Sequence, residues 1–83
     1  MKKVEIYTWS FCPFCVEAKN ILREKDISFE EIIIDGNTKT LKRLKKKTAC
    51  ATVPQIFVDD VFVGGCDDLK ALIKESNFNK TFK

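Results

Sequence analysis

Two cysteines separated by two residues, Cys12 and Cys15, are the side chains in this 83-residue chain with the most evident chemistry. Thiol pairs at this spacing exchange with disulfides or bind metals. The residues before the pair alternate β-branched and aromatic side chains, which predicts a strand over 3–8. The residues after it predict a helix over 13–25, and Pro13 favours a helix that begins there, because proline lacks the N–H that a first helical residue leaves unpaired.

The predicted position of Cys12 at the start of a helix indicates a reactive thiol. Unpaired N–H groups at a helix start carry partial positive charge and stabilise a thiolate, the nucleophilic form of cysteine. Cys15 lies one turn into the helix, so we expect Cys12 to be the exposed thiol and Cys15 the buried one. In disulfide exchange Cys12 would attack and Cys15 would resolve the mixed disulfide. A structural disulfide or zinc site for Cys12, and a core role for Cys15, are the alternatives.

Two later motifs accompany the cysteine pair. They are Thr52-Val53-Pro54 and Gly64-Gly65-Cys66-Asp67-Asp68. With residues 7–15 these motifs resemble, in order and spacing, the glutaredoxin family, and in particular its short bacterial dithiol members with a Cys-Pro-aromatic-Cys site. The resemblance covers about residues 3–75.

The resemblance implies a thioredoxin-like α/β fold, with a mixed four-stranded sheet, helices on both faces and the order βαβαββα. The residue patterns predict the same order of elements. Strands are predicted over 3–8, 29–34, 55–58 and 61–64, and helices over 13–25, 38–48 and 67–75.

Finer features of these elements also follow from the residues. Ala18, Ile21 and Leu22 should face the core at helical spacing. The run 32–34 consists of three isoleucines, which predicts a strand covered on both faces. Asn37 or Thr38 should cap the second helix, and residues 76–83 should form either a loose tail or a short helix.

For function, the resemblance implies a glutathione-dependent thiol–disulfide oxidoreductase. Cys12 would be the nucleophile and Cys15 the resolving thiol, acting on protein–glutathione mixed disulfides and on protein disulfides. Glutathione would be the co-substrate, with no tightly bound cofactor and no metal. The residues implied to bind glutathione are Phe14, Thr52, Val53, Pro54, Gly65, Cys66 and Asp67.

Two of these implied contacts have specific chemistry. A cis Val53–Pro54 bond would leave the Val53 backbone groups free to pair with glutathione as a short strand addition. Asp67 and the N–H groups of the following helix would bind the charged γ-glutamyl end. The alternative for Asp67 and Asp68 is that they only cap that helix.

One position departs from the family pattern. Many glutaredoxins carry Lys or Arg three residues before the first cysteine, where this chain has Trp9. Lys39 or Lys42, from the basic segment 39–47, are candidates to supply that cation, and a solvated helix face is the alternative for the segment. We expect Cys50 to be partly buried.

Composition limits the remaining possibilities. The chain has no histidine, which excludes Cys–His catalysis, and its net charge of +3 comes without a recognisable nucleic-acid motif. Its length fits a single domain over 1–83. It shows no signal peptide and no apolar run of roughly 20 residues, so we expect a cytoplasmic protein that does not contact membrane or nucleic acid and acts as a monomer.

Two other functions share the same fold. The first is a glutaredoxin-like redoxin recharged by thioredoxin reductase, which the glycine pair with Asp67 disfavours. The second is a glutathione-assisted iron–sulfur cluster module, which Pro13 disfavours, because cluster-binding members usually carry Gly or Ser there.

Overall fold

The structure, a computed structural model, describes residues 2–83. Within them four strands form one sheet in the order β2-β1-β3-β4. The elements are β1 Val4–Thr8, α1 Pro13–Glu24, β2 Glu30–Ile33, α2 Thr38–Thr48, β3 Gln55–Val58, β4 Val61–Gly64, α3 Cys66–Lys74 and α4 Phe78–Phe82. β1 and β2 are parallel, whereas β3 is antiparallel to both β1 and β4, so the predicted mixed sheet is confirmed.

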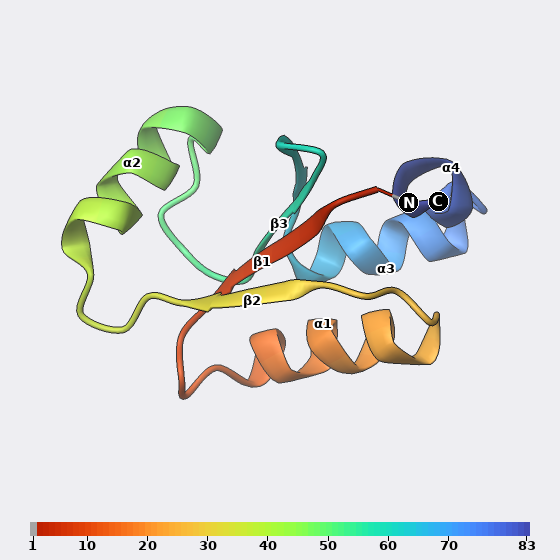
Figure 1. The fold of residues 1–83 in the computed structure, drawn as a ribbon, viewed down its shortest axis with the longest axis horizontal. Coiled ribbons are helices and arrows are strands. Elements are labelled where there is room, and N and C mark those ends of the chain that lie inside the picture. The colour runs from red at the N-terminus through yellow and green to blue at the C-terminus, as the bar shows by residue number, and fades with distance from the viewer. Residues whose placement is uncertain (1) are drawn as a thin grey trace.

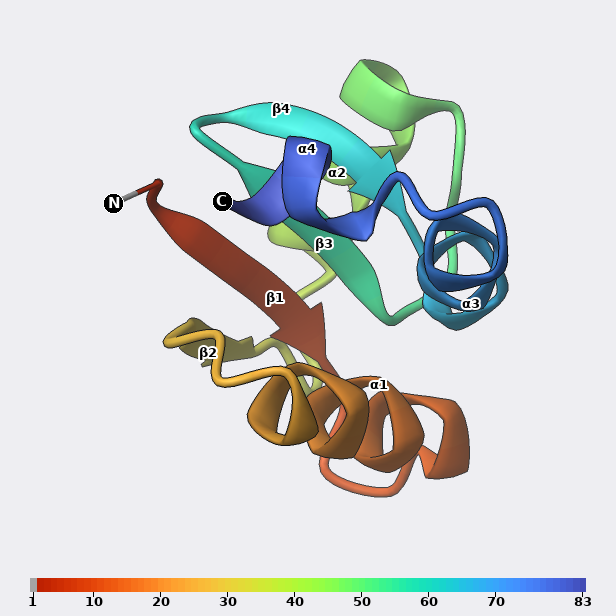
Figure 2. The ribbon, with the colours of Figure 1, turned by 90° about the vertical axis from the view of Figure 1, so that its right-hand side faces the viewer.

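The sheet lies between two helical layers, with α1 and α3 on one face and α2 on the other (Figures 1 and 2). Alternate residues of the central strands separate the two layers, since successive side chains of a strand point to opposite faces. Ile6 and Ile56 pack with Leu22 and Leu69 of α1 and α3. Their neighbours Tyr7 and Phe57 lie in the cluster on the α2 face. Helices on both faces are therefore confirmed.

Local sequence signals place the helix boundaries. Ala18 and Leu22 are fully buried, as the helical spacing predicts, and Ile21 packs against the same core. Asn37, rather than Thr38, caps α2, because its Oδ1 accepts a 3.0 Å hydrogen bond from the Thr40 N–H. A side-chain oxygen in this role satisfies one of the unpaired donors at a helix start.

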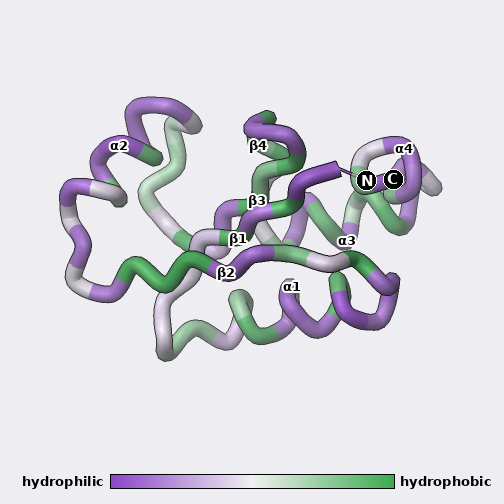
Figure 3. Tube along the Cα trace, viewed as in Figure 1, coloured by the Kyte–Doolittle hydropathy of each residue, from purple (hydrophilic) through white to green (hydrophobic). Residues whose placement is uncertain are grey.

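α2 is hydrophilic along most of its length (Figure 3). Leu44 is buried and Leu41 is partly buried against the sheet, while the lysines between and beyond them face solvent. Within residues 2–83, the structure contains no helix whose length and apolar character would let it cross a membrane.

The prediction that 32–34 is covered on both faces is wrong. β2 is an edge strand, and Ile33 is 56% exposed while Ile34 is buried. The strand buried along its whole length is β3, the third in the sequence and an interior strand of the sheet. A run of isoleucines predicts a strand but does not determine its place in the sheet order.

The C-terminal residues form the short helix α4 and not a loose tail, so the order of elements ends with one helix more than βαβαββα. The rings of Phe78 and Phe82 stack with centroids 4.6 Å apart, and both side chains are buried in the core beside α1 and α3. Lys2 Nζ donates to the carbonyl oxygens of Lys80 and Thr81, which ties the two ends of the described chain together.

Candidate active site

Cys12 occupies the N-cap of α1, and Pro13 is the first helical residue, as predicted. The Cys12 Sγ accepts a 3.2 Å hydrogen bond from the backbone N–H of Cys15. The helix start therefore presents a donor, together with the positive end of its dipole, to this sulfur. Such a site stabilises negative charge on Cys12, which is what a nucleophilic thiol requires.

The burial of the pair differs from the prediction in one respect. Cys15 is the more buried thiol, at 1% exposure, but Cys12 is itself only 8% exposed. The expectation of an exposed Cys12 is wrong because the chain segment of Val53, distant in sequence, lies over it: the Val53 carbonyl oxygen is 3.9 Å from Cys12 Sγ. A substrate can therefore approach the Cys12 sulfur only from the side that the Val53 segment leaves open.

Burial raises the pKa of the Cys15 thiol to about 12, and the side-chain hydrogen bond with Cys12 adds to this effect. Lys19 acts in the opposite direction, as does a hydrogen bond with the Trp9 backbone. Cys15 is therefore a protonated thiol at neutral pH. It must lose its proton before it can attack a disulfide.

A groove of about 250 Å³ lies beside Val53, whose carbonyl oxygen is 3.9 Å from Cys12 Sγ; neither Cys12 nor Cys15 itself lines this groove. It is lined by Phe14, Cys50, Thr52, Val53, Pro54, Gln55, Phe62, Gly65, Cys66, Asp67 and Asp68. All seven residues predicted to bind the co-substrate are among them, although they come from three separate segments of the chain. The fold therefore gathers the three motifs around one hollow beside Cys12.

The segment before β3 forms one wall of this groove. The Val53–Pro54 peptide bond is cis, as the resemblance implied. Within residues 2–83, the Val53 N–H donates to no acceptor. Gln55, which the sequence analysis did not single out, shapes this wall: its buried side-chain amide donates to the carbonyl oxygens of Cys50 (2.8 Å) and Thr52 (3.0 Å). The sequence did carry a signal for this role, because Gln55 is the one polar residue in an otherwise apolar strand.

The glycine pair forms the opposite wall. Gly64 has φ +135°, and a Cβ at this position would overlap the Asp68 carboxylate, so both conformation and space require glycine. A Cβ at Gly65 would lie 3.2 Å from the Pro54 carbonyl oxygen, which shows how closely the two walls approach. Asp68 Oδ2 accepts a 2.9 Å hydrogen bond from the Gly65 N–H, whereas Asp67 is exposed and has no such partner within residues 2–83.

Comparisons with known proteins identify this arrangement. The glutaredoxin family model matches residues 4–63. The chain belongs to the glutaredoxin family. It is 50% identical to glutaredoxin 3 of Escherichia coli K12 over 72 residues, 87% of each chain. It is therefore a glutathione-dependent thiol–disulfide oxidoreductase, as the motifs predict.

Solved glutaredoxins share the fold. A glutaredoxin from Brucella melitensis, 38% identical, superposes with a TM-score of 0.89 over 100% of this chain and 90% of that one. A buckwheat glutaredoxin–glutathione complex, 18% identical, has a TM-score of 0.92 over 98% of this chain and 76% of that one. These matches confirm the thioredoxin-like fold.

The other two cysteines of this glutaredoxin differ in environment. Cys50 is exposed at the groove rim, so the prediction of partial burial is wrong; it lies in the loop between α2 and β3, outside the packed layers. Cys66 is buried, and burial raises the pKa of its thiol. Cys66 therefore lines the groove as an uncharged thiol. All four cysteines in the structure are free thiols.

The groove of this glutaredoxin is lined by no lysine or arginine of residues 2–83. Lys39 borders a different hollow, formed by residues 35–39, and Lys42 borders neither. Lys47 lies over the Phe57 ring, with Nζ 5.1 Å from the centroid. Neither Lys39 nor Lys42 therefore lines the groove, and a role for either as the cation near Cys12 stays a prediction.

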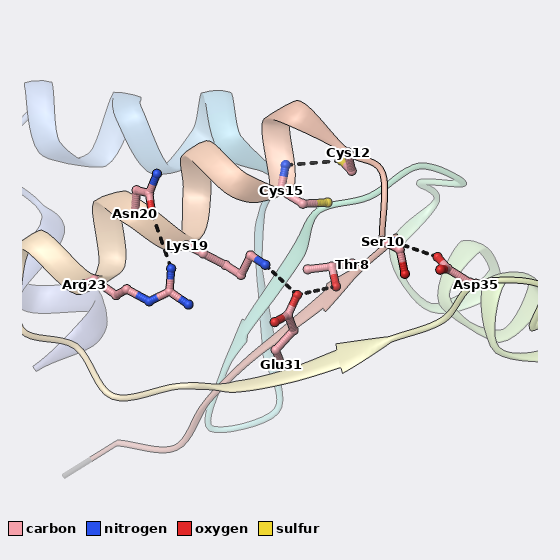
Figure 4. Close-up of polar contacts among 9 residues, drawn as sticks. All are labelled: Thr8, Ser10, Cys12, Cys15, Lys19, Asn20, Arg23, Glu31 and Asp35. Carbon is pink, nitrogen blue, oxygen red and sulfur yellow. Dashed lines mark hydrogen bonds and ion pairs between the residues drawn. The ribbon is translucent and has the colours of Figure 1, made fainter.

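A hydrogen bond to the loop after β2 holds the loop that precedes Cys12. The Ser10 N–H donates a 2.8 Å hydrogen bond to Asp35 Oδ1 in the loop after β2 (Figure 4). Hydrogen bonding from Ser10, first by its side chain and then by this N–H, lowers the pKa of the Asp35 carboxyl. This bond links the loop between β1 and α1 to the segment that leads into α2.

Proposed function

We propose that this glutaredoxin reduces protein–glutathione mixed disulfides with Cys12 as nucleophile, and protein disulfides with Cys12 and Cys15 together. One observation carries the proposal. Cys12 Sγ lies at the start of α1, accepts the Cys15 N–H, and stands beside the groove whose walls hold the predicted binding residues.

In the single-thiol reaction the Cys12 thiolate attacks the glutathione sulfur of a mixed disulfide. The bond between glutathione and the protein breaks, the protein leaves as a thiolate that takes a proton from solvent, and Cys12 becomes glutathionylated. A second glutathione thiolate then attacks the glutathione sulfur on Cys12. Glutathione disulfide is released, and the Cys12 thiolate is restored.

In the two-thiol reaction Cys12 attacks one sulfur of a protein disulfide and expels the other as a thiolate. Cys15 loses its proton and attacks Cys12 Sγ, which expels the second substrate thiolate and forms a Cys12–Cys15 disulfide. Two glutathione molecules reduce that disulfide in turn. Glutaredoxins operate at about −200 to −230 mV, a potential from which glutathione can recharge them.

The groove residues hold glutathione in an extended form. The free Val53 N–H and its carbonyl group pair with the cysteine backbone of glutathione. N–H groups at the start of α3 bind the γ-glutamyl carboxylate, and the exposed Asp67 carboxylate binds its ammonium group. Phe14, Thr52 and Pro54 complete the walls. The buckwheat glutaredoxin of the same fold, solved with glutathione, supports this assignment.

The cellular setting belongs to the same proposal. We place the enzyme in the cytoplasm, where glutathione keeps thiols reduced, as an electron carrier to glutathionylated proteins and to reductases that cycle through a disulfide. A single domain over 1–83 that acts as a monomer is part of the proposal, and the bonds from Lys2 to the last helix support the single domain.

The test is a coupled assay on a glutathionylated peptide, with glutathione, glutathione reductase and NADPH. We expect sustained NADPH oxidation that depends on this protein. Turnover supported by thioredoxin reductase but not by glutathione would instead indicate the redoxin alternative. A coloured protein after anaerobic purification, with absorbance lost on acid treatment, would indicate the cluster-binding alternative.

A further inference from the structure

A polar cluster lies beside Cys15, on the side of α1 that faces the sheet edge (Figure 4). Lys19 follows Cys15 by four residues, which places the two side chains on the same face of the helix. The Lys19 side chain is only 18% exposed, and its Nζ lies 2.8 Å from Glu31 Oε2 on β2. A lysine held this far from solvent, next to a buried thiol, is unusual for a surface helix.

Two donors fix the Glu31 carboxylate. Oε2 also accepts a 2.8 Å hydrogen bond from the hydroxyl of Thr8, whose side chain is fully buried at the end of β1. The hydrogen bond from Lys19 lowers the pKa of Glu31, so this carboxylate remains charged at neutral pH. Glu31 is thus a poor proton acceptor, and its function in the cluster is to hold the ammonium group.

The surroundings of Cys15 offer few other charges. On its own segment it meets Cys12, and the Trp9 backbone lies within hydrogen-bond reach. On β2, Glu31 is already paired with Lys19. On β1, the partly buried Tyr7 packs against the hydrophobic cluster that contains Cys15. The charge of Lys19 acts on the Cys15 thiol and favours its thiolate.

We propose that Lys19, held by Glu31 and Thr8, is a positioning residue for the two-thiol reaction, where its ammonium group stabilises the Cys15 thiolate that attacks Cys12. The inference rests on the resolving role proposed for Cys15. A charge on the same helix face as the thiol, in a site where the lysine side chain is only 18% exposed, interacts more strongly than the same charge in water.

The step balances without any further reactant. The Cys15 thiol releases its proton to solvent, its sulfur bonds to Cys12 Sγ, and the disulfide between Cys12 and the substrate breaks. The substrate sulfur leaves as a thiolate and takes up a proton. No proton passes through Lys19 in this step, so it changes the rate through charge alone.

Reduced protein and one equivalent of 2,2′-dithiodipyridine separate the two attacks without glutathione. The attack by Cys12 releases one pyridine-2-thione at a rate that depends on the concentrations of protein and reagent. The attack by Cys15 on the resulting mixed disulfide is intramolecular, so it releases the second pyridine-2-thione at a rate that is independent of those concentrations. A Cys50→Ser background removes the exposed third thiol. The variants are Lys19→Met, Lys19→Arg, Glu31→Gln and, as a matched control, Arg23→Met, which removes an equal charge one turn further along α1.

We expect Lys19→Met to slow the second release about tenfold at pH 7, the change that one pKa unit produces, and to leave the first release unchanged. The deficit should keep the same factor on both sides of neutral pH, because the Cys15 pKa of about 12 lies far above that range and the thiolate fraction of both proteins then rises equally with pH. Lys19→Arg should restore most of the rate, and Arg23→Met should match the parent in both phases. Glu31→Gln keeps the Lys19 charge but holds its ammonium group less firmly. This variant should therefore slow the second release by a smaller factor.

Three results would overturn the inference: an unchanged second release in Lys19→Met, equal slowing of both releases, or equal slowing in Arg23→Met. If Lys19→Met does not fold, judged by circular dichroism, Glu31→Gln at the parent rate overturns it. A parent protein without any second release would instead refute the role proposed for Cys15, so the two failures are distinguishable.

Discussion

The carboxylate of Asp68 accepts a 2.9 Å hydrogen bond from the backbone N–H of Gly65, the residue that caps α3. Its neighbour Asp67 is exposed at the groove and makes no such bond within residues 2–83. Asp68 thus takes the capping role that the sequence left open for both aspartates, and ligand binding by Asp67 stays a prediction. Asp68 reaches back from the third helical position in the manner of a capping box.

Asp67→Ala should raise the apparent KM for a glutathionylated peptide by roughly threefold to tenfold, the loss expected for one partly exposed charged hydrogen bond. Alkylation of Cys12 by iodoacetamide, which carries no ammonium group, should be unchanged. Initial rates in the coupled assay, with thermal melting of the same sample, provide the measurement. Parent-like KM together with a lowered melting temperature would assign Asp67 to the cap.

Asp68→Ala is the matched control for that variant. It should lower the free energy of unfolding by about 1 kcal/mol, because the Gly65 N–H loses its acceptor at a helix start. Its KM should change less than that of Asp67→Ala. Urea titration followed by circular dichroism measures the stability. The reverse pattern, with KM raised more by Asp68→Ala, would exchange the two roles.

Cys12→Ser should abolish both reactions, since Cys12 is the cysteine whose sulfur receives an N–H at the start of α1. Cys15→Ser should keep reduction of a glutathionylated peptide and lose direct reduction of a protein disulfide. Parallel assays with the two substrates measure this, and Cys50→Ser is the control that should retain both activities. Equal loss of the glutathionylated-peptide reaction in both variants contradicts the division of roles.

Stability at acid pH should depend on Glu31. Its hydrogen bonds to Lys19 and Thr8 lower the pKa of its carboxyl in the folded state below the ordinary value of 4.5. The stabilisation is therefore fully present above about pH 4.5 and is lost as pH falls through the folded pKa. Glu31→Gln should cost about 1 kcal/mol at pH 7 and progressively less below pH 4.5. Urea midpoints measured from pH 3 to 7 test this; a constant difference across the range would refute it.

Phe82→Ala should lower the free energy of unfolding by about 3–5 kcal/mol, because the ring is buried against Phe78 and leaves a cavity. Phe11→Ala is the control: the Phe11 ring is 97% exposed, so its removal should change stability by less than about 0.5 kcal/mol. Chemical denaturation of both variants makes the comparison. A Phe82→Ala protein as stable as Phe11→Ala would show that α4 contributes nothing to the core.

The sequence alone determined the order of elements from β1 to α3, the start of α1 at Pro13 and the cysteine that caps it. These features depend on residues a few positions apart: alternation within a strand, helical spacing, and a proline at the first helical position. The three motifs could also be assigned to one family, because each is a short segment with its own constraints. Seven of the residues that line the groove were therefore predicted before their positions in space were seen.

Tertiary structure decided which of these residues meet and which are covered. Ile33 is exposed because β2 lies at the sheet edge, and Cys12 is nearly buried because Val53, 41 residues away, lies over it. The pairing of Lys19 with Glu31, 12 residues away, likewise requires α1 to lie against β2. Burial and hydrogen-bond partners depend on which elements become neighbours. Spacing along the chain does not specify that, because the packing of the whole sheet and its helices selects the neighbours.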